Sequence, residues 1–405
     1  MLNQNHTLQL LLDSYREGYS LPADFYQNAA LYEADLAAVF YQSWIYAGHI
    51  SQVGESGQYF TLEFGDESII VVKGKDSIVR AFANVCRHRG SRVCLEKQGK
   101  AGAFVCPYHA WTYELDGRLR SRRAMSADFK KEEFGLKEVG ISIFHGLIFI
   151  NLDKDAPDLE RELAGMSSAM DIYQIDQTRV AKQQTFSVDA NWKLAIENFM
   201  ECYHCGPAHA EYSQSHALHA PKDYEDMRPA MLEQAEKIGY QIDSIDQSNP
   251  EDSNRVQHFY NRSAMYEKYV TGSKSGEPVA PLLGRIPKFG GGAADLMFGP
   301  ATYAIFYADH AVLYRFLPTA VQKTDMEIFW LVREDAEEGK DYQLDTLTWL
   351  WTVTTEADKT IILNNQRGVN SQFYEPGPLS EMESFITVFT DWYLAKMQTH
   401  LNLAY

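Results

Sequence analysis

The 405-residue sequence has few cysteines, fewer basic than acidic residues and no long apolar run. Five cysteines, an odd number, exclude the disulfide scaffold of a small secreted protein and favour the reducing cytoplasm. The 37 Lys and Arg residues against 55 Asp and Glu residues, a net charge of −18, argue against nucleic-acid binding, which requires a basic surface. No uncharged apolar run approaches the ~20 residues of a membrane-spanning helix. The N-terminus also lacks the basic flank of a signal peptide, so neither membrane attachment nor export is expected.

The hydrophobic pattern divides the chain into three parts. Residues 1–40 are polar with a helical pattern, and we predict an N-terminal arm that packs on the C-terminal domain. From about residue 41, short β-type runs alternate with glycine-containing turns. Asp116-Gly117 lies between two such runs and indicates a hairpin. Residues 41–155 therefore predict a small antiparallel β domain, with its last apolar strand at 141–151.

The remaining residues, 156–405, predict an α+β domain. A strand at 186–189 leads into a helix from Trp192 to about His204, and the polar stretch 221–295 suggests mobile loops with short helices. Three strand-like runs follow. In the first, Tyr303, Ile305 and Tyr307 alternate with other residues, as in a sheet with one face on a core or pocket. A long helix at about 341–366 completes an antiparallel sheet with helices packed on it.

Two cysteines and two histidines occur as a pair of short motifs, Cys86-Arg87-His88 and Cys106-Pro107-Tyr108-His109. Each motif begins just after a predicted strand and so occupies a loop. Zinc sites usually keep like ligands together along the chain, whereas here each loop offers one thiolate and one imidazole. That arrangement favours a [2Fe–2S] cluster with the cysteines on one iron and the histidines on the other. Zinc and two unrelated Cys/His pairs are the alternatives.

A second group of possible metal ligands begins in the helix that Trp192 opens. His204 and His209 would lie about 140° apart on a continuous helix, but Gly206-Pro207 can break it and let the two imidazoles converge. Two histidines and one carboxylate form the site of non-haem Fe(II) oxygenases. Asp358 falls on the apolar stripe of the C-terminal helix, where a charged group requires a partner or a metal, and Glu356 falls off that stripe.

These motifs resemble those of the Rieske non-haem iron oxygenases, large (alpha) subunit, over nearly the whole chain. The match includes Asp358, eight residues before Gln366-Arg367-Gly368. The resemblance implies a small all-β Rieske domain plus a helix-grip (START-like) catalytic domain. Cys86, His88, Cys106 and His109 would hold the [2Fe–2S] cluster, and His204, His209 and Asp358 would hold Fe(II). Asn198 and Glu201 are the candidate catalytic residues, with Glu201 as the electron bridge to the Rieske histidine of a neighbouring subunit.

The segment Glu201-Cys202-Tyr203-His204-Cys205 is similar to the branch acting on quaternary ammonium compounds such as glycine betaine, proline betaine or carnitine. This resemblance implies a monooxygenase that uses dioxygen, with electrons from NAD(P)H through a separate flavin and iron–sulfur reductase. Hydroxylation of an N-methyl group would give N-demethylation and formaldehyde. The alternatives are an aromatic ring-hydroxylating dioxygenase that forms a cis-dihydrodiol, and an electron-transfer protein without the second metal. Aromatic side chains could enclose a methylammonium group, and the candidates are Phe199, Tyr203, Tyr212, Tyr303, Phe306, Tyr307 and Trp330.

Charge and cysteine placement add two further expectations. Residues 41–155 contain 16 basic and 14 acidic residues, so the net negative charge lies in the rest of the chain. This asymmetry favours head-to-tail docking of the β domain on a neighbour's catalytic domain, and the family resemblance implies that the ring is a homotrimer. Cys202 and Cys205 are interpreted as small apolar residues packed beneath the iron site, so no disulfide is expected.

Overall fold

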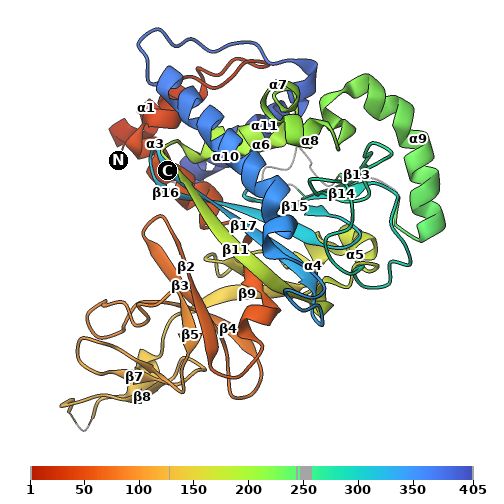
Figure 1. Ribbon diagram of the computed structural model, residues 1–405. Coiled ribbons are helices and arrows are strands. Elements are labelled where there is room, and N and C mark those ends of the chain that lie inside the picture. The colour runs from red at the N-terminus through yellow and green to blue at the C-terminus, as the bar shows by residue number, and fades with distance from the viewer. Residues whose placement is uncertain (1, 127, 243–244, 247–257, 404–405) are drawn as a thin grey trace.

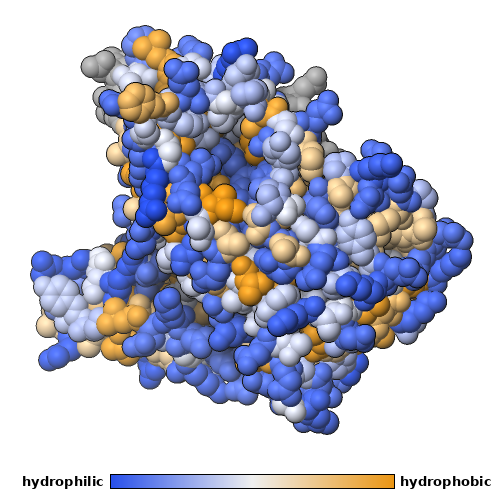
Figure 2. Space-filling view, turned by 45° about the horizontal axis from the view of Figure 1, so that its top comes forward, coloured by the Kyte–Doolittle hydropathy of each residue, from blue (hydrophilic) through white to orange (hydrophobic). Residues whose placement is uncertain are grey.

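The computed structural model describes residues 2–126, 128–242, 245–246 and 258–403. Figure 1 shows a smaller β region, built from the segment 45–151, and a larger region in which helices cover an antiparallel sheet. This is the predicted α+β class. No helix within the described ranges is both long enough and apolar enough to cross a bilayer. On the face drawn in Figure 2, hydrophobic residues form small separate patches in a mainly hydrophilic surface.

The β region contains a seven-stranded sheet in the order β1-β10-β9-β4-β3-β2-β5 and a three-stranded sheet β6-β7-β8. Neighbouring strands are antiparallel throughout. The single strand expected at 141–151 is wrong, because His145 and Gly146 both adopt left-handed backbone angles and turn the chain into a hairpin. The strands are β1 (Ile45–His49), β2 (Gln58–Phe64), β3 (Glu67–Lys73), β4 (Val79–Ala83), β5 (Gln98–Lys100), β6 (Phe104–Val105), β7 (Thr112–Tyr113), β8 (Leu119–Ser121), β9 (Glu138–Phe144) and β10 (Leu147–Asn151).

The larger region is organised around a second seven-stranded antiparallel sheet, in the order β11-β17-β16-β15-β14-β13-β12. Its two faces belong to different cores. Tyr303 and Ile305 pack on the helical side, whereas Ala304 and Phe306 pack on the other side, as the alternation at 302–307 predicts. The strands are β11 (Thr178–Val188), β12 (Ile245–Asp246), β13 (His258–Ser263), β14 (Ala293–Phe298), β15 (Thr302–Phe306), β16 (Ala311–Ala320) and β17 (Lys323–Arg333).

Helix α10 (Leu344–Val369) lies along the helical side of this sheet and confirms the predicted long helix. Its buried residues include Leu347, Leu350, Trp351 and Asp358, so the apolar stripe read from the sequence is the face that packs inward. Gln366 near its end accepts a hydrogen bond of 2.8 Å from the backbone N–H of Asn191. That bond joins the C-terminal part of α10 to the start of α6 (Trp192–Met200).

The stretch 221–295 is more regular than its polar composition predicted. It contains the 18-residue helix α9 (Pro221–Ile238) and the strands β13 and β14, while residues 247–257, where loops were also expected, lie outside the described residues. Only Met231, Ala235 and Ile238 of α9 are buried. So narrow an apolar stripe on a polar helix does not distinguish the helix from a loop in the sequence. The other α-helices of the described residues are α1 (Leu2–Leu12), α2 (Asp24–Gln27), α3 (Ala29–Asp35), α4 (Leu159–Glu162), α5 (Ala164–Met170), α7 (Cys205–Ala208), α8 (Ala210–Ser213) and α11 (Ser384–Leu403).

Candidate metal centres

The two Cys/His motifs form matched loops at one end of the β region. In the first loop, Cys86 donates its N–H to the carbonyl of Ser91 at 2.8 Å and accepts from the N–H of Gly90 at 3.0 Å. Cys106 makes the same two backbone bonds, to Trp111 at 2.8 Å and from Ala110 at 3.0 Å. Two equivalent turns thus present two equivalent pairs of side chains.

The side chains of these loops separate by type. Cys86 and Cys106 are buried, with 3% and 2% exposure, whereas His88 is exposed and His109 is half-buried. The Nδ1 atoms of the two imidazoles lie 3.2 Å apart and so face a common point. The hydroxyl of Tyr113 is within 3.3 Å of the Cys86 sulfur. Buried thiols beneath paired surface imidazoles fit a [2Fe–2S] cluster with both histidines on the outer iron.

The second group of ligands comes from two distant parts of the chain. Ligand atoms of His204, His209 and Asp358 all lie within 4.8 Å of one another. Oδ1 of Asp358 is 2.8 Å from Nε2 of His209 and 3.4 Å from Nε2 of His204. Burial opposes charge on His204, but its bonds with Asp358 and Glu201 outweigh burial and raise its pKa to about 9. A buried cluster of this composition fits a divalent iron with positions left open for dioxygen.

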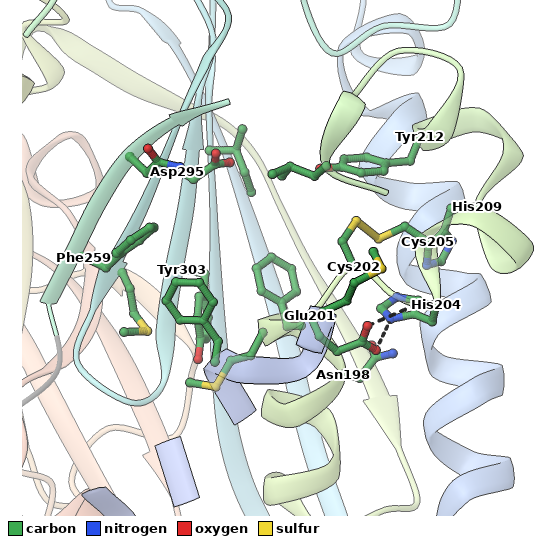
Figure 3. A pocket seen from close by; sticks show the side chains of 18 of the residues that line it. Asn198, Glu201, Cys202, His204, Cys205, His209, Tyr212, Phe259, Asp295 and Tyr303 are labelled. Carbon is green, nitrogen blue, oxygen red and sulfur yellow. Dashed lines mark hydrogen bonds and ion pairs between the residues drawn. A yellow bond between two sulfur atoms is a disulfide. The ribbon is translucent and has the colours of Figure 1, made fainter. Parts of the chain in front are cut away.

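Glu201 fixes the orientation of His204. One carboxylate oxygen accepts hydrogen bonds from the N–H of Tyr203 at 2.5 Å and of His204 at 3.1 Å. The other pairs with Nδ1 of His204, as the dashed lines in Figure 3 mark, so Nε2 is left to face Asp358. This second interaction of the imidazole is the usual way in which a metal-binding histidine is held in place.

The local backbone differs from the helix expected to reach about His204. Helix α6 ends at Met200, and Glu201 is extended, with φ −127° and ψ 158°. Its carboxylate binds the next free N–H groups, which replaces continued helical bonding. Gly206-Pro207 lies inside the short helix α7 rather than at a break, and His209 follows directly after it.

Cys202 and Cys205 form a disulfide, so their interpretation as unpaired packed residues is wrong. The bond closes the turn that contains His204 and lies at the cavity wall in Figure 3. Cys-x-x-Cys spacing permits such a bond, but it does not distinguish a disulfide from two thiols. The other cysteines are unpaired and buried.

A cavity of about 670 Å³ extends from the cluster of His204, His209 and Asp358. Asn198, predicted as a catalytic residue, lines it from α6. Of the seven aromatic candidates, Phe199, Tyr212 and Tyr303 line the cavity. The others do not: Tyr203 is 57% exposed, Phe306 packs on the opposite face of the sheet, and Tyr307 and Trp330 are core residues.

Most of the other lining residues were not identified from the sequence, and Phe259, Trp351 and Asp295 are three of them. The signal for Asp295 was present, because it is the one acid in the apolar strand Ala293–Phe298. An acid in such a strand requires an explanation, as Asp358 does on α10.

The chain thus combines loops suited to an iron–sulfur cluster with a separate site suited to mononuclear iron, which together define an iron-dependent oxygenase. Residues 43–140 match the family described as Rieske [2Fe-2S] domain. Residues 175–399 match the ring hydroxylating alpha subunit (catalytic domain). The chain belongs to the Rieske non-haem iron oxygenases and is an alpha, or oxygenase, subunit. Its cofactors are accordingly a [2Fe–2S] cluster and mononuclear iron, with electrons supplied by a separate reductase.

Comparison with characterised proteins adds relatives of known function. The chain is 36% identical over 401 residues, 96% of this chain and 88% of the relative, to the glycine betaine monooxygenase oxygenase subunit of Chromohalobacter salexigens. It is 38% identical over 205 residues, 49% of this chain and 54% of the relative, to the carnitine monooxygenase oxygenase subunit of Escherichia coli.

Solved structures share the fold at lower identity. The quaternary ammonium Rieske monooxygenase CntA, in complex with an inhibitor, has a TM-score of 0.71 at 24% identity, covering 96% of this chain and 98% of its own. Naphthalene 1,2-dioxygenase from Rhodococcus sp. also has a TM-score of 0.71, at 20% identity, covering 97% and 98%. Because the fold is common to both, it does not distinguish between their substrates.

Proposed function

We propose that this chain is the oxygenase subunit of a monooxygenase that N-demethylates a quaternary ammonium compound. The observation that carries the proposal is the convergence of His204, His209 and Asp358 on a cavity with aromatic walls. A methylammonium group neither donates nor accepts hydrogen bonds, so aromatic faces are suited to bind it. The glycine betaine and carnitine relatives support the same class of substrate.

Within this proposal each site residue has a role. Cys86, Cys106, His88 and His109 hold the [2Fe–2S] cluster, with the histidines toward the surface. The second set, His204, His209 and Asp358, holds Fe(II). Iron bound by two imidazoles and one carboxylate retains open positions and supplies the dioxygen chemistry. Glu201 positions His204 through its Nδ1, and Asn198 presents an amide to the cavity.

The net reaction balances with two electrons from NAD(P)H through the reductase. One N-methyl group, one O2, two electrons and two protons give one N-hydroxymethyl group and one water. A C–H bond is replaced by a C–O bond in this step. The hydroxymethyl group then loses formaldehyde and a proton, and its C–N electron pair remains on nitrogen as a tertiary amine.

Assembly also belongs to the proposal. In Figure 1 the loops next to β7 lie at the far end of the molecule from α7 and α10, which flank the mononuclear site. We propose that a homotrimer places each subunit's His88 and His109 near Glu201 of a neighbour. The difference in net charge between residues 41–155 and the remainder favours that head-to-tail contact. One solved relative is described as revealing inter-subunit electron transfer.

The test is a product assay with purified, iron-loaded protein, its reductase, NAD(P)H and dioxygen. Formaldehyde should accumulate with one member of a panel of glycine betaine, proline betaine and carnitine, in a one-to-one ratio with the tertiary amine product. Absence of formaldehyde from every betaine, together with a cis-dihydrodiol from an aromatic acid, would establish the dioxygenase alternative instead.

A further inference from the structure

Asp295 is a cavity-lining carboxylate that none of the roles above uses. It lies on β14 in a cross-strand row with Asn261 on β13 and Ile305 on β15. Its strand neighbours at i−2 and i+2, Ala293 and Met297, pack into the core on the helical side, so its side chain points to that same side. Asn261 and Ile305 line the cavity with it.

One oxygen of this carboxylate is left without a partner. Oδ2 of Asp295 is buried and accepts no hydrogen bond. A buried carboxylate oxygen of this kind carries a free-energy cost unless something compensates for it. Burial raises the pKa of Asp295 to about 6, although the nearby hydroxyl of Ser263 and the charge of Arg262 lower it, so the group is still mainly ionised at neutral pH.

The neighbouring cation is engaged elsewhere. The guanidinium of Arg262 donates to the carbonyl of Gly291 at 2.9 and 2.5 Å, to that of Gly292 at 3.1 Å and to the hydroxyl of Tyr173 at 2.8 Å. Arg262 follows Asn261 on β13, and its side chain therefore leaves the opposite face of the sheet. Among the described residues, no ion pair with Asp295 is present.

Aromatic rings surround the same part of the cavity. Figure 3 shows Asp295 and Tyr212 on opposite walls at one end, with Phe259 and Tyr303 along the wall toward Glu201. Burial, and after it the negative charge of Asp295, raise the pKa of Tyr212 well above its usual value. The end of the cavity therefore combines a carboxylate with aromatic faces.

We infer that Asp295 is the counter-ion for the quaternary ammonium head of the substrate, which binds between this carboxylate and the ring of Tyr212. The inference rests on the proposed function and adds a residue that determines specificity. A primary ammonium or a guanidinium would need several hydrogen-bond acceptors, whereas a trimethylammonium head needs only nearby negative charge and aromatic surface. The neutral ring of an aromatic acid has no positive charge for this carboxylate to bind, so the same residue favours the betaine over the substrate of the dioxygenase alternative.

The experiment compares a cation with an uncharged analogue of the same shape. Binding of glycine betaine and of 3,3-dimethylbutanoate, in which carbon replaces the ammonium nitrogen, is measured by calorimetry on the iron-loaded protein without reductase. In Asp295→Asn, glycine betaine should bind about tenfold or more weakly, and 3,3-dimethylbutanoate should bind as well as before or better. Asp226→Asn, the same change at an exposed acid of α9 that does not line the cavity, should leave both affinities within about twofold.

The outcomes separate the two proposals. If the wild-type protein binds glycine betaine and Asp295→Asn binds it equally well, the counter-ion role is wrong and the proposed function stands. If the wild-type protein binds none of glycine betaine, proline betaine and carnitine, the proposed function itself fails. Far-UV circular dichroism and the cluster absorbance check that the variant folds. Should it not fold, Asp295→Ser removes the same charge in a smaller volume, and the same loss of betaine binding is expected.

Discussion

At the scale of single residues, Asp358 and Glu356 show how position on one helix separates a candidate metal ligand from a surface acid. They are two residues apart on α10, yet Glu356 is exposed and Asp358 is 8% exposed, between His204 and His209. Burial alone would raise the pKa of Asp358, but hydrogen bonds from the two histidines lower it. The carboxylate is therefore held in its ionised form, the form that binds a metal.

Replacing Asp358 by Ala should remove the mononuclear iron and leave the [2Fe–2S] cluster in place. Iron analysis should fall from about three to about two atoms per chain, turnover should be lost, and the visible spectrum of the cluster should not change. Glu356→Ala, on the exposed side of the same helix, is the matched control and should retain all three irons. Full iron content in Asp358→Ala would remove this residue from the ligand set.

In the proposed function, Glu201 acts through His204 rather than on the substrate. Its carboxylate accepts from two backbone N–H groups and holds Nδ1 of His204. Gln would keep one acceptor oxygen for the backbone but would present an NH2 group to the imidazole. The bond that orients His204 and increases its basicity would then be lost.

We expect Glu201→Gln to lower turnover by about 10- to 100-fold, the usual effect of removing the partner of a metal-binding histidine. Because Glu201 is also proposed to link two subunits, the pre-reduced cluster should be re-oxidised more slowly by substrate and dioxygen. Glu201→Asp, which keeps the charge, should restore part of that rate. Equal rates of cluster re-oxidation in Glu201→Gln and the wild-type protein, with normal iron content, would contradict the link.

At the scale of elements, α6 has a different role on each side. Asn198 and Phe199 face the cavity, whereas Lys193 and Glu197 are buried on the other side. Lys193 pairs with Asp35 of α3, and both oxygens of Glu197 accept from the hydroxyl of Tyr26 of α2, at 3.1 and 3.0 Å. The N-terminal helices thus hold the helix that leads into the iron site.

The stability that the contacts between α6 and the N-terminal helices give to the protein should depend on pH. Burial raises the pKa of Glu197 to about 8, although the bond from Tyr26 and the charge of Lys193 lower it. The unfolded chain releases this proton near pH 4.5 and the folded chain near pH 8, so stability is lost as pH rises between these values. One pKa unit corresponds to about 1.4 kcal/mol, so the loss for this group is on the order of 5 kcal/mol.

Glu197→Gln cannot lose a proton and should escape this loss. Its melting temperature should equal that of the wild-type protein near pH 5 and exceed it by several degrees near pH 8.5. Glu356→Gln should have the same melting temperature as the wild-type protein at both pH values, since Glu356 is exposed. Parallel melting curves for Glu197→Gln and wild type across this range would show that Glu197 ionises normally in the fold.

The elements also show which features a sequence can reveal. The strands β15, β16 and β17 could be predicted from their apolar runs, and helix α10 from its apolar stripe. The candidate metal ligands could be proposed because their spacing is distinctive. The end of α6 at Met200 could not be predicted, because the side-chain carboxylate of Glu201 binds the N–H groups that a continued helix would use. Asp295 is visible in the sequence as the one acid of an apolar strand, but its lack of an ion-pair partner becomes evident only when the neighbouring strands and Arg262 are placed around it.

At the scale of the whole molecule, the two metal sites are on the same chain but not next to each other. Figure 1 shows the cluster loops at the tip of the β region and the α7–α10 site in the other region. The two regions are joined by packing and by hydrogen bonds, such as those from Arg315 on β16 to the carbonyls of Tyr46 at 2.9 Å and Ala47 at 2.6 Å. This separation within one chain supports the proposed head-to-tail contact, in which the cluster of a neighbour would supply the electrons.

Mixed assemblies test this arrangement directly. A Cys86→Ser subunit should lack a working cluster and an Asp358→Ala subunit should lack mononuclear iron, so each is inactive alone. In trimers formed by co-expression at equal levels, about a quarter of the head-to-tail contacts join an intact cluster to an intact iron site, and about a quarter of wild-type turnover should return. Mixing the two separately purified trimers without subunit exchange should restore none. If co-expressed trimers shown to contain both subunits are inactive, electrons must pass within a single chain, and the head-to-tail contact would have no catalytic role.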